Sequence, residues 1–203
     1  MRVCLSLFIL CFLAGTATIS AEDWNQFRGA AGNGKALAKL PLEFSESDGL
    51  AWKVPLPGKA WSSPVIWKKQ IWVTNALPDG HKLWALCFDL ETGKKIHDIL
   101  VFDVAEPQFC IAKNSYASPT PVIEEGRIFV SFGAHGNACI DTATGKTIWE
   151  RRDLQCNHHR APASSPVPYK DLYILHFDGF DKQYVVALDK KTGETRWTHQ
   201  RAF

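Results

Sequence analysis

The sequence contains a single methionine among 203 residues, and it has no large excess of charge of either sign. Lys and Arg number 23 and Asp and Glu number 21, so the net charge is +2. Such a balance argues against a nucleic-acid-binding protein that works by neutralising phosphates. Only one long apolar run occurs, at the N-terminus, and this excludes a protein with several membrane spans. The hydrophobic content of 46% also excludes wholesale disorder.

The cysteines form no Cys-x-x-Cys motif, so the sequence supports neither a zinc ribbon nor a c-type haem site. Cys87 and Cys139 lie in apolar, strand-like runs and are expected to be small buried residues. Cys110 and Cys156 lie in predicted loops, where export of the protein would permit a disulfide between them. The alternative for this pair is that both thiols are free.

Residues 1–21 have the charged, apolar and small-residue order of a secretory signal peptide, with cleavage expected after Ala21. Cys4 and Cys11 fall within this segment and are assigned to it. The alternative is an uncleaved membrane anchor, although the apolar run of about a dozen residues is short for a span. We therefore expect an exported protein, periplasmic or extracellular, that contacts a membrane only through this segment.

A repeat runs through the rest of the chain. Three segments share an Asp-x-x-Thr-Gly signal, and their glycines are 52 and 48 residues apart. A Ser-Pro marker precedes each segment, at Ser63, Ser118 and Ser165. A period of about 40–50 residues that contains several short strands is typical of a β-propeller rather than a helical array. The repeated segments are CFDLETGKKIH (87–97), CIDTATGKTIW (139–149) and ALDKKTGETRW (187–197).

Each repeat contains four strand-like runs separated by turn residues. The eight tryptophans and twelve phenylalanines also favour pleated surfaces over helices. We therefore predict an all-β fold, with a lead-in at 22–53 and a propeller region at 54–203. The predicted blades cover about 59–104, 116–152 and 163–201.

The Asp and the Gly of the repeated Asp-x-x-Thr-Gly signal both favour a tight turn. The Asp side chain can accept backbone N–H groups within a tight turn, and the Gly supplies the positive φ that closes a bulged hairpin. The Trp four residues later falls on the outermost strand, where it can wedge between neighbouring blades, and His97 holds this place in the first repeat. The predicted structural residues are Asp89, Gly93, Asp141, Gly145, Trp149, Asp189, Gly193 and Trp197.

The pattern Ala-x-Asp-x-x-Thr-Gly-x-x-x-Trp, complete at 187–197, resembles the tryptophan-docking repeat of quinoprotein-type β-propellers. The segment DWNQFRGAAGNG at 23–34 is similar to the opening of exported bacterial PQQ-binding-like β-propeller repeat proteins. In that family the segment ending at Trp52 supplies the outer strand of the last blade and closes the ring. The resemblance implies a partial β-propeller of about three four-stranded antiparallel blades plus an N-terminal closing strand.

Whole members of this family look like rings of seven or eight blades, which at this period is about 350–400 residues. The three predicted blades correspond to the N-terminal part of such a ring, as a fragment or as a truncated gene product. A partial ring exposes two blade faces, and we expect these faces to promote association or instability.

The residues give little support to a quinone cofactor, although the family name suggests one. A quinoprotein dehydrogenase, as the family is known, carries adjacent cysteines, calcium ligands and a catalytic Asp. This sequence has no Cys-Cys pair, and DGFD at 178–181 lacks the remaining oxygens of a calcium loop. No cofactor is evident, and PQQ and calcium are expected only in a complete propeller. The Ser-Pro markers lack the Gly-x-Ser-x-Gly of a nucleophile elbow, so no catalytic residue is assigned.

Polar and aromatic residues gather in the loops at one mouth of the predicted channel. Cys156, His158 and His159 are of metal-ligating types, but adjacent His side chains diverge and no fourth ligand is evident, so no metal site is assigned. Ordinary loop capping and inter-blade hydrogen bonding compete with a ligand-binding role here. The candidate ligand-rim residues are Trp61, Asn114, Tyr116, His135, His158 and Asp178.

The first function that fits these features is an exported, non-enzymatic binding or scaffold platform. The propeller lipoprotein of the bacterial outer-membrane assembly machine is its nearest analogy, by fold only. The alternative is a quinoprotein-like oxidoreductase of the PQQ-dependent dehydrogenase type, whose cofactor residues lie in blades missing from this chain. A sugar- or peptide-binding mouth is a third hypothesis. The sequence leaves the partner open between a protein and a small molecule or glycan.

Overall fold

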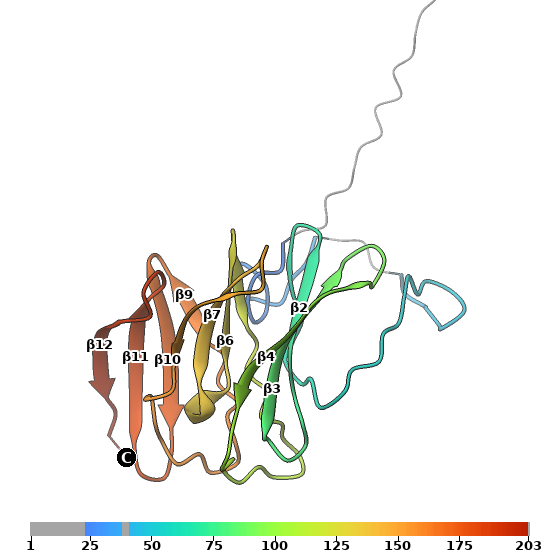
Figure 1. The fold of residues 1–203 in the computed structure, drawn as a ribbon. Coiled ribbons are helices and arrows are strands. Elements are labelled where there is room, and N and C mark those ends of the chain that lie inside the picture. Colours follow the sequence, from blue (N-terminus) through green and yellow to red (C-terminus); the bar gives the residue numbers. More distant parts are fainter. Residues whose placement is uncertain (1–22, 38–40, 203) are drawn as a thin grey trace, which may run out of the picture.

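A computed structural model describes residues 23–37 and 41–202, and the predicted signal segment at 1–21 lies outside the described residues. Within these ranges the chain forms three four-stranded antiparallel sheets and one short 3-10 helix. The sheets stand side by side in chain order, coloured from green through yellow to red in Figure 1. The predicted all-β class, a partial β-propeller, is confirmed. No helix in the described ranges has the length and apolar character needed to cross a bilayer.

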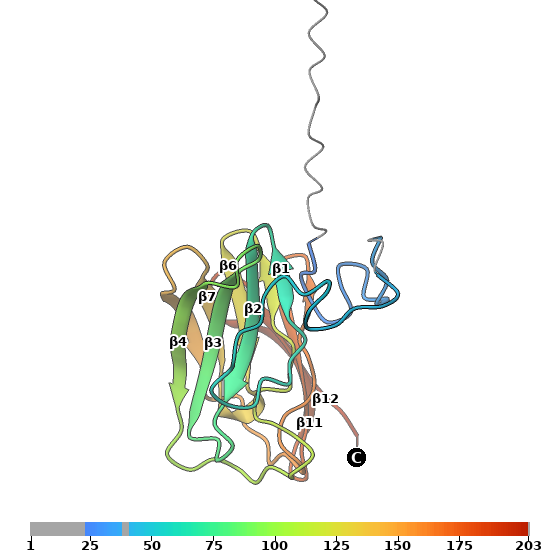
Figure 2. The same ribbon diagram turned by 90° about the vertical axis from the view of Figure 1, so that its right-hand side faces the viewer.

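Each sheet is an up-and-down meander in which strands adjacent in the chain are adjacent in space, as Figure 2 shows for the first sheet. The first sheet consists of β1 (Val65–Trp67), β2 (Gln70–Ala76), β3 (Lys82–Asp89) and β4 (Lys95–Asp103). The second consists of β5 (Val122–Glu124), β6 (Arg127–Ser131), β7 (Asn137–Asp141) and β8 (Thr147–Arg151), with the helix η1 (Gly133–His135) between β6 and β7. The third consists of β9 (Val167–Tyr169), β10 (Leu172–Asp178), β11 (Gln183–Asp189) and β12 (Thr195–Gln200).

The hydrophobic core consists of two clusters, one on each side of the second sheet. Ile128 of β6 packs with Trp72 of the first sheet, whereas its neighbour Phe129 packs with Trp149 and Tyr173 on the other side. Successive residues of a strand point to opposite faces, so a middle sheet needs apolar residues at consecutive positions. Burial of each such side chain contributes about 1.5–3 kcal/mol.

The Asp-x-x-Thr-Gly segments form the turns between the third and fourth strands of the sheets. Asp141 Oδ1 accepts hydrogen bonds from the hydroxyl of Thr144 at 2.8 Å and from its backbone N–H at 2.7 Å. These two bonds to the carboxylate lower the pKa of Asp141. Gly145 follows with φ of 72°, which is costly for any residue with a side chain. Asp89 caps its turn in the same way, whereas Asp189 accepts the backbone N–H of Thr192 and the hydroxyl of Thr192 donates to Glu194.

The indole of Trp149 joins the second sheet to the turn of the third. Its Nε1–H donates to the carbonyl of Lys190 at 3.0 Å, and the side chain is only 8% exposed. The ring packs on Gly193, where an added Cβ would lie 2.7 Å from a ring atom. The turn glycine therefore has two roles: it permits the positive φ, and it leaves room for the neighbouring indole.

The same contact recurs at the other two turns with different donors. Trp52 Nε1–H donates to the carbonyl of Leu90 at 3.0 Å and packs on the turn glycine of the first sheet. His97 replaces the tryptophan of the first sheet, and its Nε2 lies 3.1 Å from the carbonyl of Thr142 in the second. In all three cases the acceptor is the carbonyl of the residue after the turn Asp.

Trp197 holds the corresponding place on β12, but its surroundings differ. Its side chain is 41% exposed, because no further sheet follows β12 among the described residues. Of the two tryptophans predicted to be structural, Trp149 is therefore the one that makes an inter-sheet contact.

The Ser-Pro markers lie at the inner edge, which we define as the side of the assembly formed by β1, β5 and β9. The backbone N–H of Ser63 donates to Thr120 Oγ1, and the backbone N–H of Thr120 donates to Ser165 Oγ, both at 3.0 Å. The counterpart of Ser63 and Ser165 is therefore Thr120, two residues beyond the predicted Ser118. The reason is that β5 begins at Val122, directly after the second proline of Ser-Pro-Thr-Pro.

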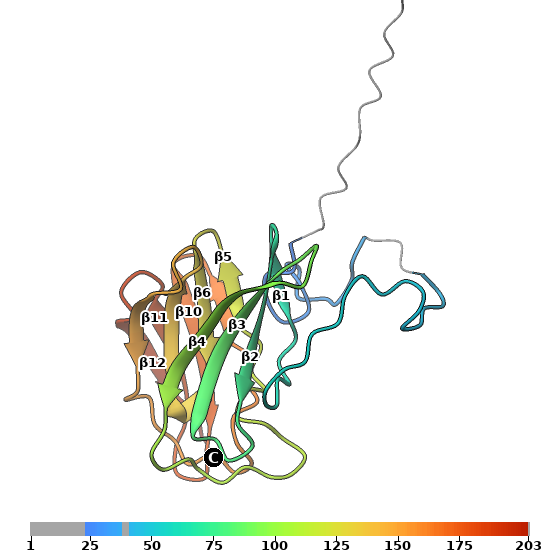
Figure 3. The ribbon, with the colours of Figure 1, turned by 45° about the vertical axis from the view of Figure 1, so that its right-hand side comes forward.

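The N-terminal segment at 23–34 also lies along the inner edge, next to β1 in Figure 3. Trp24 exchanges two backbone hydrogen bonds with Ile66 of β1, at 2.9 and 2.8 Å. The carbonyl of Asn25 accepts the backbone N–H of Ile123 in β5 at 2.9 Å. This segment therefore connects the first two sheets by backbone hydrogen bonds.

The contrast between Trp149 and Trp197 gives a direct test of the docking contact. Trp149→Ala removes a buried indole and its hydrogen bond, and we expect a loss of about 3–5 kcal/mol in the free energy of unfolding. Trp197→Ala is the matched control, with an expected loss of about 1 kcal/mol or less. Urea unfolding followed by far-UV circular dichroism measures both, and equal losses would contradict the proposed role of the contact.

Candidate binding site at the loop end of the sheets

The connections 104–121 and 152–166 run side by side at one end of the sheets, which we call the loop end (lower part of Figure 1). The helix η1 lies at the same end, between the two connections. Four of the six candidate rim residues, Asn114, Tyr116, His135 and His158, lie in these connections or in η1. Trp61 lies in the segment before β1, and Asp178 lies at the end of β10.

Gln108 is the centre of the hydrogen bonds that hold the loop end together. Its backbone N–H donates to His135 Nε2 at 3.1 Å, and its side-chain amide donates to the carbonyl of Cys156 at 2.9 Å. Its side-chain oxygen accepts the backbone N–H of His158 at 2.9 Å, and its carbonyl accepts the hydroxyl of Tyr116 at 2.6 Å. One glutamine thus ties both connections to η1, and no motif in the sequence identified it.

Tyr116 and Asn114 are engaged within the chain. Tyr116 is buried, and its ring packs on Gly80, where an added Cβ would lie 2.5 Å from a ring atom. The amide of Asn114 donates to the carbonyl of Arg160 at 2.8 Å, and its oxygen accepts the hydroxyl of Ser118 at 2.6 Å. Asn114 therefore joins the two connections, and Tyr116 ties the first connection to the turn that contains Gly80. Contact between either side chain and a ligand stays a prediction.

Two buried histidines also act as hydrogen-bond acceptors at the loop end. His135 accepts from Gln108, as described above, and His158 Nε2 accepts the backbone N–H of Ala134 at 3.0 Å. Burial lowers the pKa of His135. Burial also lowers the pKa of His158 to about 4, and the nearby His135 adds to this effect. At neutral pH both imidazoles are therefore uncharged and able to accept.

The cysteines and histidines of this region do not converge on one point. Cys156 is buried with its Sγ 3.5 Å from His158 Nδ1, and burial raises the pKa of its thiol to about 12. His159 instead meets the edge of the Phe180 ring, with centroids 4.3 Å apart. No group of three His, Cys, Asp or Glu in the described residues could hold a metal ion. The four described cysteines are free, with Cys87 and Cys139 buried as expected.

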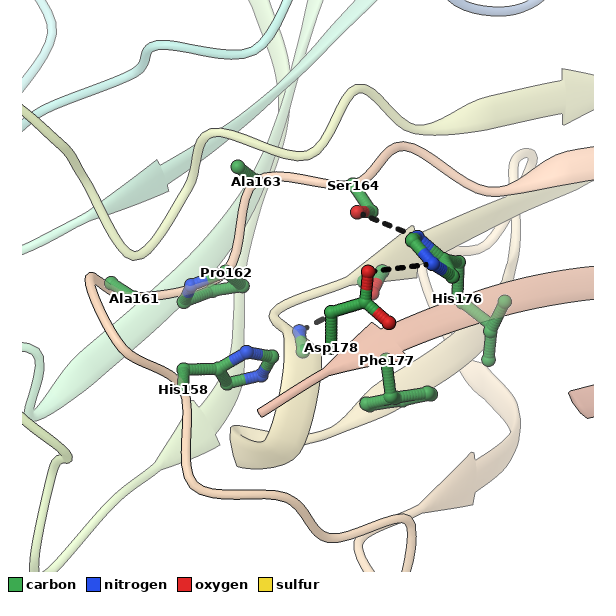
Figure 4. A pocket seen from close by; sticks show the side chains of 11 residues that line it. His158, Ala161, Pro162, Ala163, Ser164, His176, Phe177 and Asp178 are labelled. Carbon is green, nitrogen blue, oxygen red and sulfur yellow. Dashed lines mark hydrogen bonds and ion pairs between the residues drawn. The ribbon is translucent and has the colours of Figure 1, made fainter. Parts of the chain in front are cut away.

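Ser164, His176 and Asp178 form a connected set beside a cavity of about 110 Å³ (Figure 4). Ser164 Oγ lies 3.2 Å from His176 Nδ1, and Asp178 Oδ2 lies 3.0 Å from His176 Nε2. The guanidinium of Arg201 contacts both His176 Nε2 and Asp178. A guanidinium can only donate and a carboxylate can only accept, so His176 Nε2 lies between a donor, Arg201, and an acceptor, Asp178. Arg201 and Asp178 also pair with each other, so the three side chains form one hydrogen-bonded group.

Trp61 is the candidate rim residue that is most open to solvent, at 49% exposed. It borders a second hollow of about 510 Å³ at the inner edge, together with Phe27 of the N-terminal segment. We call this the inner hollow. Phe27 was not predicted as a site residue, because nothing in the local sequence places the N-terminal segment beside Trp61. The residues of the inner hollow that matter below are Phe27, Trp61, Ser63, Thr120, Ser165 and His176.

The described residues do not fit PQQ, which carries three carboxylates and is accompanied by calcium in quinoproteins. The lining of the inner hollow includes no Lys or Arg that could pair with a carboxylate. The rim histidines at the loop end use their ring nitrogens for contacts within the chain. Neither the inner hollow nor the buried histidines of the loop end therefore offers groups suited to this cofactor.

Three dehydrogenases of known structure, all much longer than this chain, have a similar fold. A quinohemoprotein alcohol dehydrogenase from Comamonas testosteroni matches 88% of the chain with a TM-score of 0.63 and 17% identity. The quinohemoprotein alcohol dehydrogenase ADHIIG from Pseudomonas putida HK5 matches 75% with a TM-score of 0.55 and 18% identity. A europium-containing methanol dehydrogenase matches 76% with a TM-score of 0.53 and 18% identity.

The matched part is 27%, 22% and 27% of these three structures, so the chain spans about a quarter of their length. At such identities the likeness shows the fold alone. No curated protein gives a significant match to the sequence.

A family model described as outer membrane protein assembly factor BamB matches residues 75–202, which is more than half of the chain. The matched range contains all three Asp-x-x-Thr-Gly turns and the strands that flank them. The protein therefore belongs to this family of PQQ-like β-propeller repeat proteins.

Proposed function

We propose that the chain is part of an exported, non-enzymatic binding or scaffold platform. This proposal rests on the different roles of polar and aromatic side chains at the loop end. There the polar side chains, centred on Gln108, hold the connections in place, whereas the aromatic rings of Phe109 and Phe180 are exposed, as is Trp61 at the inner edge. A rigid backbone that presents aromatic rings is the chemistry of a recognition surface, since such rings dominate the energetics of interfaces.

The family description supports the same proposal, because an assembly factor is a protein that helps other proteins to assemble. The signal-like segment at 1–21 supports a location outside the cytoplasm. The partner is a protein, a small molecule or a glycan that the loop end or the inner hollow can contact.

The rigidity of the loop end depends on two uncharged histidines. His135 and His158 each accept a backbone N–H through Nε2, and a protonated imidazole has no acceptor atom. The charged groups nearest to them are Arg152, which opposes protonation of His135, and Asp181, which favours protonation of His158. The net effect of these surroundings is still to hold both pKa values low.

This arrangement predicts an acid-sensitive stability. The pKa of His158 is about 4 in the folded chain against 6.5 for the free side chain, so the unfolded chain binds more protons between these values. The stabilisation is therefore complete above pH 6.5 and is lost as the pH falls toward 4. We expect a loss on the order of 2 kcal/mol over this range, since solvent screens part of the shift.

Urea unfolding between pH 7 and pH 4.2 measures this dependence. His158→Gln keeps a side-chain acceptor that does not titrate, and we expect it to flatten the curve. His199→Gln, on the exposed strand β12, is the control and should leave the curve as it is. A curve that is unchanged in His158→Gln would contradict the role given to this imidazole.

The non-enzymatic character is tested by reconstitution of the purified chain with PQQ and Ca²⁺. Dye-linked oxidation of alcohols and sugars is the readout, with a known PQQ-dependent dehydrogenase as the positive control. We expect no turnover above the rate of free PQQ, because the described residues lack partners for its carboxylates. Specific turnover would overturn the proposal in favour of the quinoprotein-like oxidoreductase.

A further inference from the structure

We propose that the inner hollow binds the ring of a neutral saccharide between Phe27 and Trp61. The proposal rests on the proposed function as a binding platform and names the class of its ligand. Three properties of the hollow carry it: two exposed aromatic rings, a row of hydroxyl groups, and the lack of charge in its lining.

The aromatic rings come from segments that are far apart in the sequence and are both held in place. Phe27 is 51% exposed and follows directly after Trp24 and Asn25, which are hydrogen-bonded to the first two sheets. Trp61 lies in the connection to β1, and the ammonium of Lys59 lies 5.4 Å from its ring centroid. The apolar C–H face of a sugar ring packs well on such aromatic faces, which otherwise remain in contact with water.

The hydroxyl groups follow from the repeat. Thr120 Oγ1 and Ser165 Oγ each accept a backbone N–H at 3.0 Å, and each keeps its own O–H proton for another acceptor. Ser63 Oγ makes no hydrogen bond with any of the described residues. Thr120 is only 2% exposed, whereas Ser63 and Ser165 are half-buried, so the hydroxyls of these two serines are the ones that can bond to the hydroxyls of a ligand.

The lack of charged residues in the lining favours a neutral sugar over other classes of ligand. The residues that line the hollow include no Asp, Glu, Lys or Arg, and the titratable side chain among them, His176, is engaged by Ser164, Asp178 and Arg201. The cations next to the lining are already engaged, Lys59 by the Trp61 ring and Arg201 by Asp178, so an anionic ligand would lose its hydration without gaining a free cationic partner. A purely apolar ligand would leave the hydroxyl row without hydrogen bonds. A neutral ring with many hydroxyls satisfies both the aromatic and the polar part of the surface.

The size of the hollow is also suitable. Its volume of about 510 Å³ lies within the range of roughly 300–1,000 Å³ that small-molecule sites occupy. The cavity beside His158 and Asp178, at about 110 Å³, is much smaller and is not part of this proposal.

The test uses the full chain with three neutral trisaccharides, cellotriose, maltotriose and chitotriose, and with trigalacturonate as the anionic comparison. Isothermal titration calorimetry measures the affinities. We expect at least one neutral trisaccharide to bind, and trigalacturonate to bind at least tenfold more weakly. Phe27→Ala and Trp61→Ala should each weaken binding about tenfold.

Two further variants make the result specific to the inner hollow. Ser63→Ala removes a hydroxyl that supports no other group in the described chain, so we expect an unchanged fold and a loss of affinity of about threefold to tenfold. Phe44→Ala removes an exposed aromatic ring of the lead-in that does not line the inner hollow, and it should leave the affinity within twofold.

The proposal fails if no neutral trisaccharide binds at 10 mM, if trigalacturonate binds equally well, or if Phe27→Ala and Trp61→Ala bind like the unchanged chain. If the saccharide test fails and the PQQ test shows no turnover, only the proposed ligand class is wrong, and the proposed platform function stands. Turnover with PQQ and Ca²⁺ would remove the platform function, whatever the saccharides do.

Discussion

The structure depends on one repeated contact, in which a ring N–H donates to the carbonyl after a turn Asp, between neighbouring sheets for His97 and Trp149 and from the lead-in to the first sheet for Trp52. Trp52, His97 and Trp149 each make this contact, and the acceptor always follows the turn Asp. The contact fixes how far apart and at which height neighbouring sheets pack. The apolar clusters on both sides of the second sheet can only close when that spacing is right. The directional bond therefore positions the sheets, and burial of apolar area supplies most of the stability.

Much of the fold could be predicted because the repeat encodes it locally. An Asp that caps its own turn and a Gly with positive φ need no information from distant residues, so their spacing already located the hairpins. The match of Thr120 with Ser63 and Ser165 was missed by two residues, because two prolines follow each other there and only pairing with β6 shows where β5 starts. Such a register depends on a partner strand and cannot be derived from the segment alone.

The candidate site was less predictable for a related physical reason. Long connections have no period, so nothing in the sequence shows that Gln108 would meet His135 and His158. The polar side chains that resemble a ligand rim in sequence are those that an irregular backbone needs for its own unpaired groups. Exposed aromatic rings are not needed to satisfy unpaired backbone groups. At both the loop end and the inner edge aromatic rings are exposed, which is why the proposed binding surface rests on Trp61 and Phe27 rather than on the buried histidines.

The position of the N-terminal segment has a consequence for the order in which the chain can assemble. Asn25 is made early in synthesis, yet its backbone partner Ile123 is made almost a hundred residues later. The loop that this contact closes is long, so closing it costs chain entropy. That cost is offset only after the first two sheets have formed and can bind the segment. The part of the described chain that is synthesised first is thus among the last to reach its final place. Until then, the inner edges of β1 and β5 stay open, and the side of the inner hollow that Phe27 forms is not yet in place.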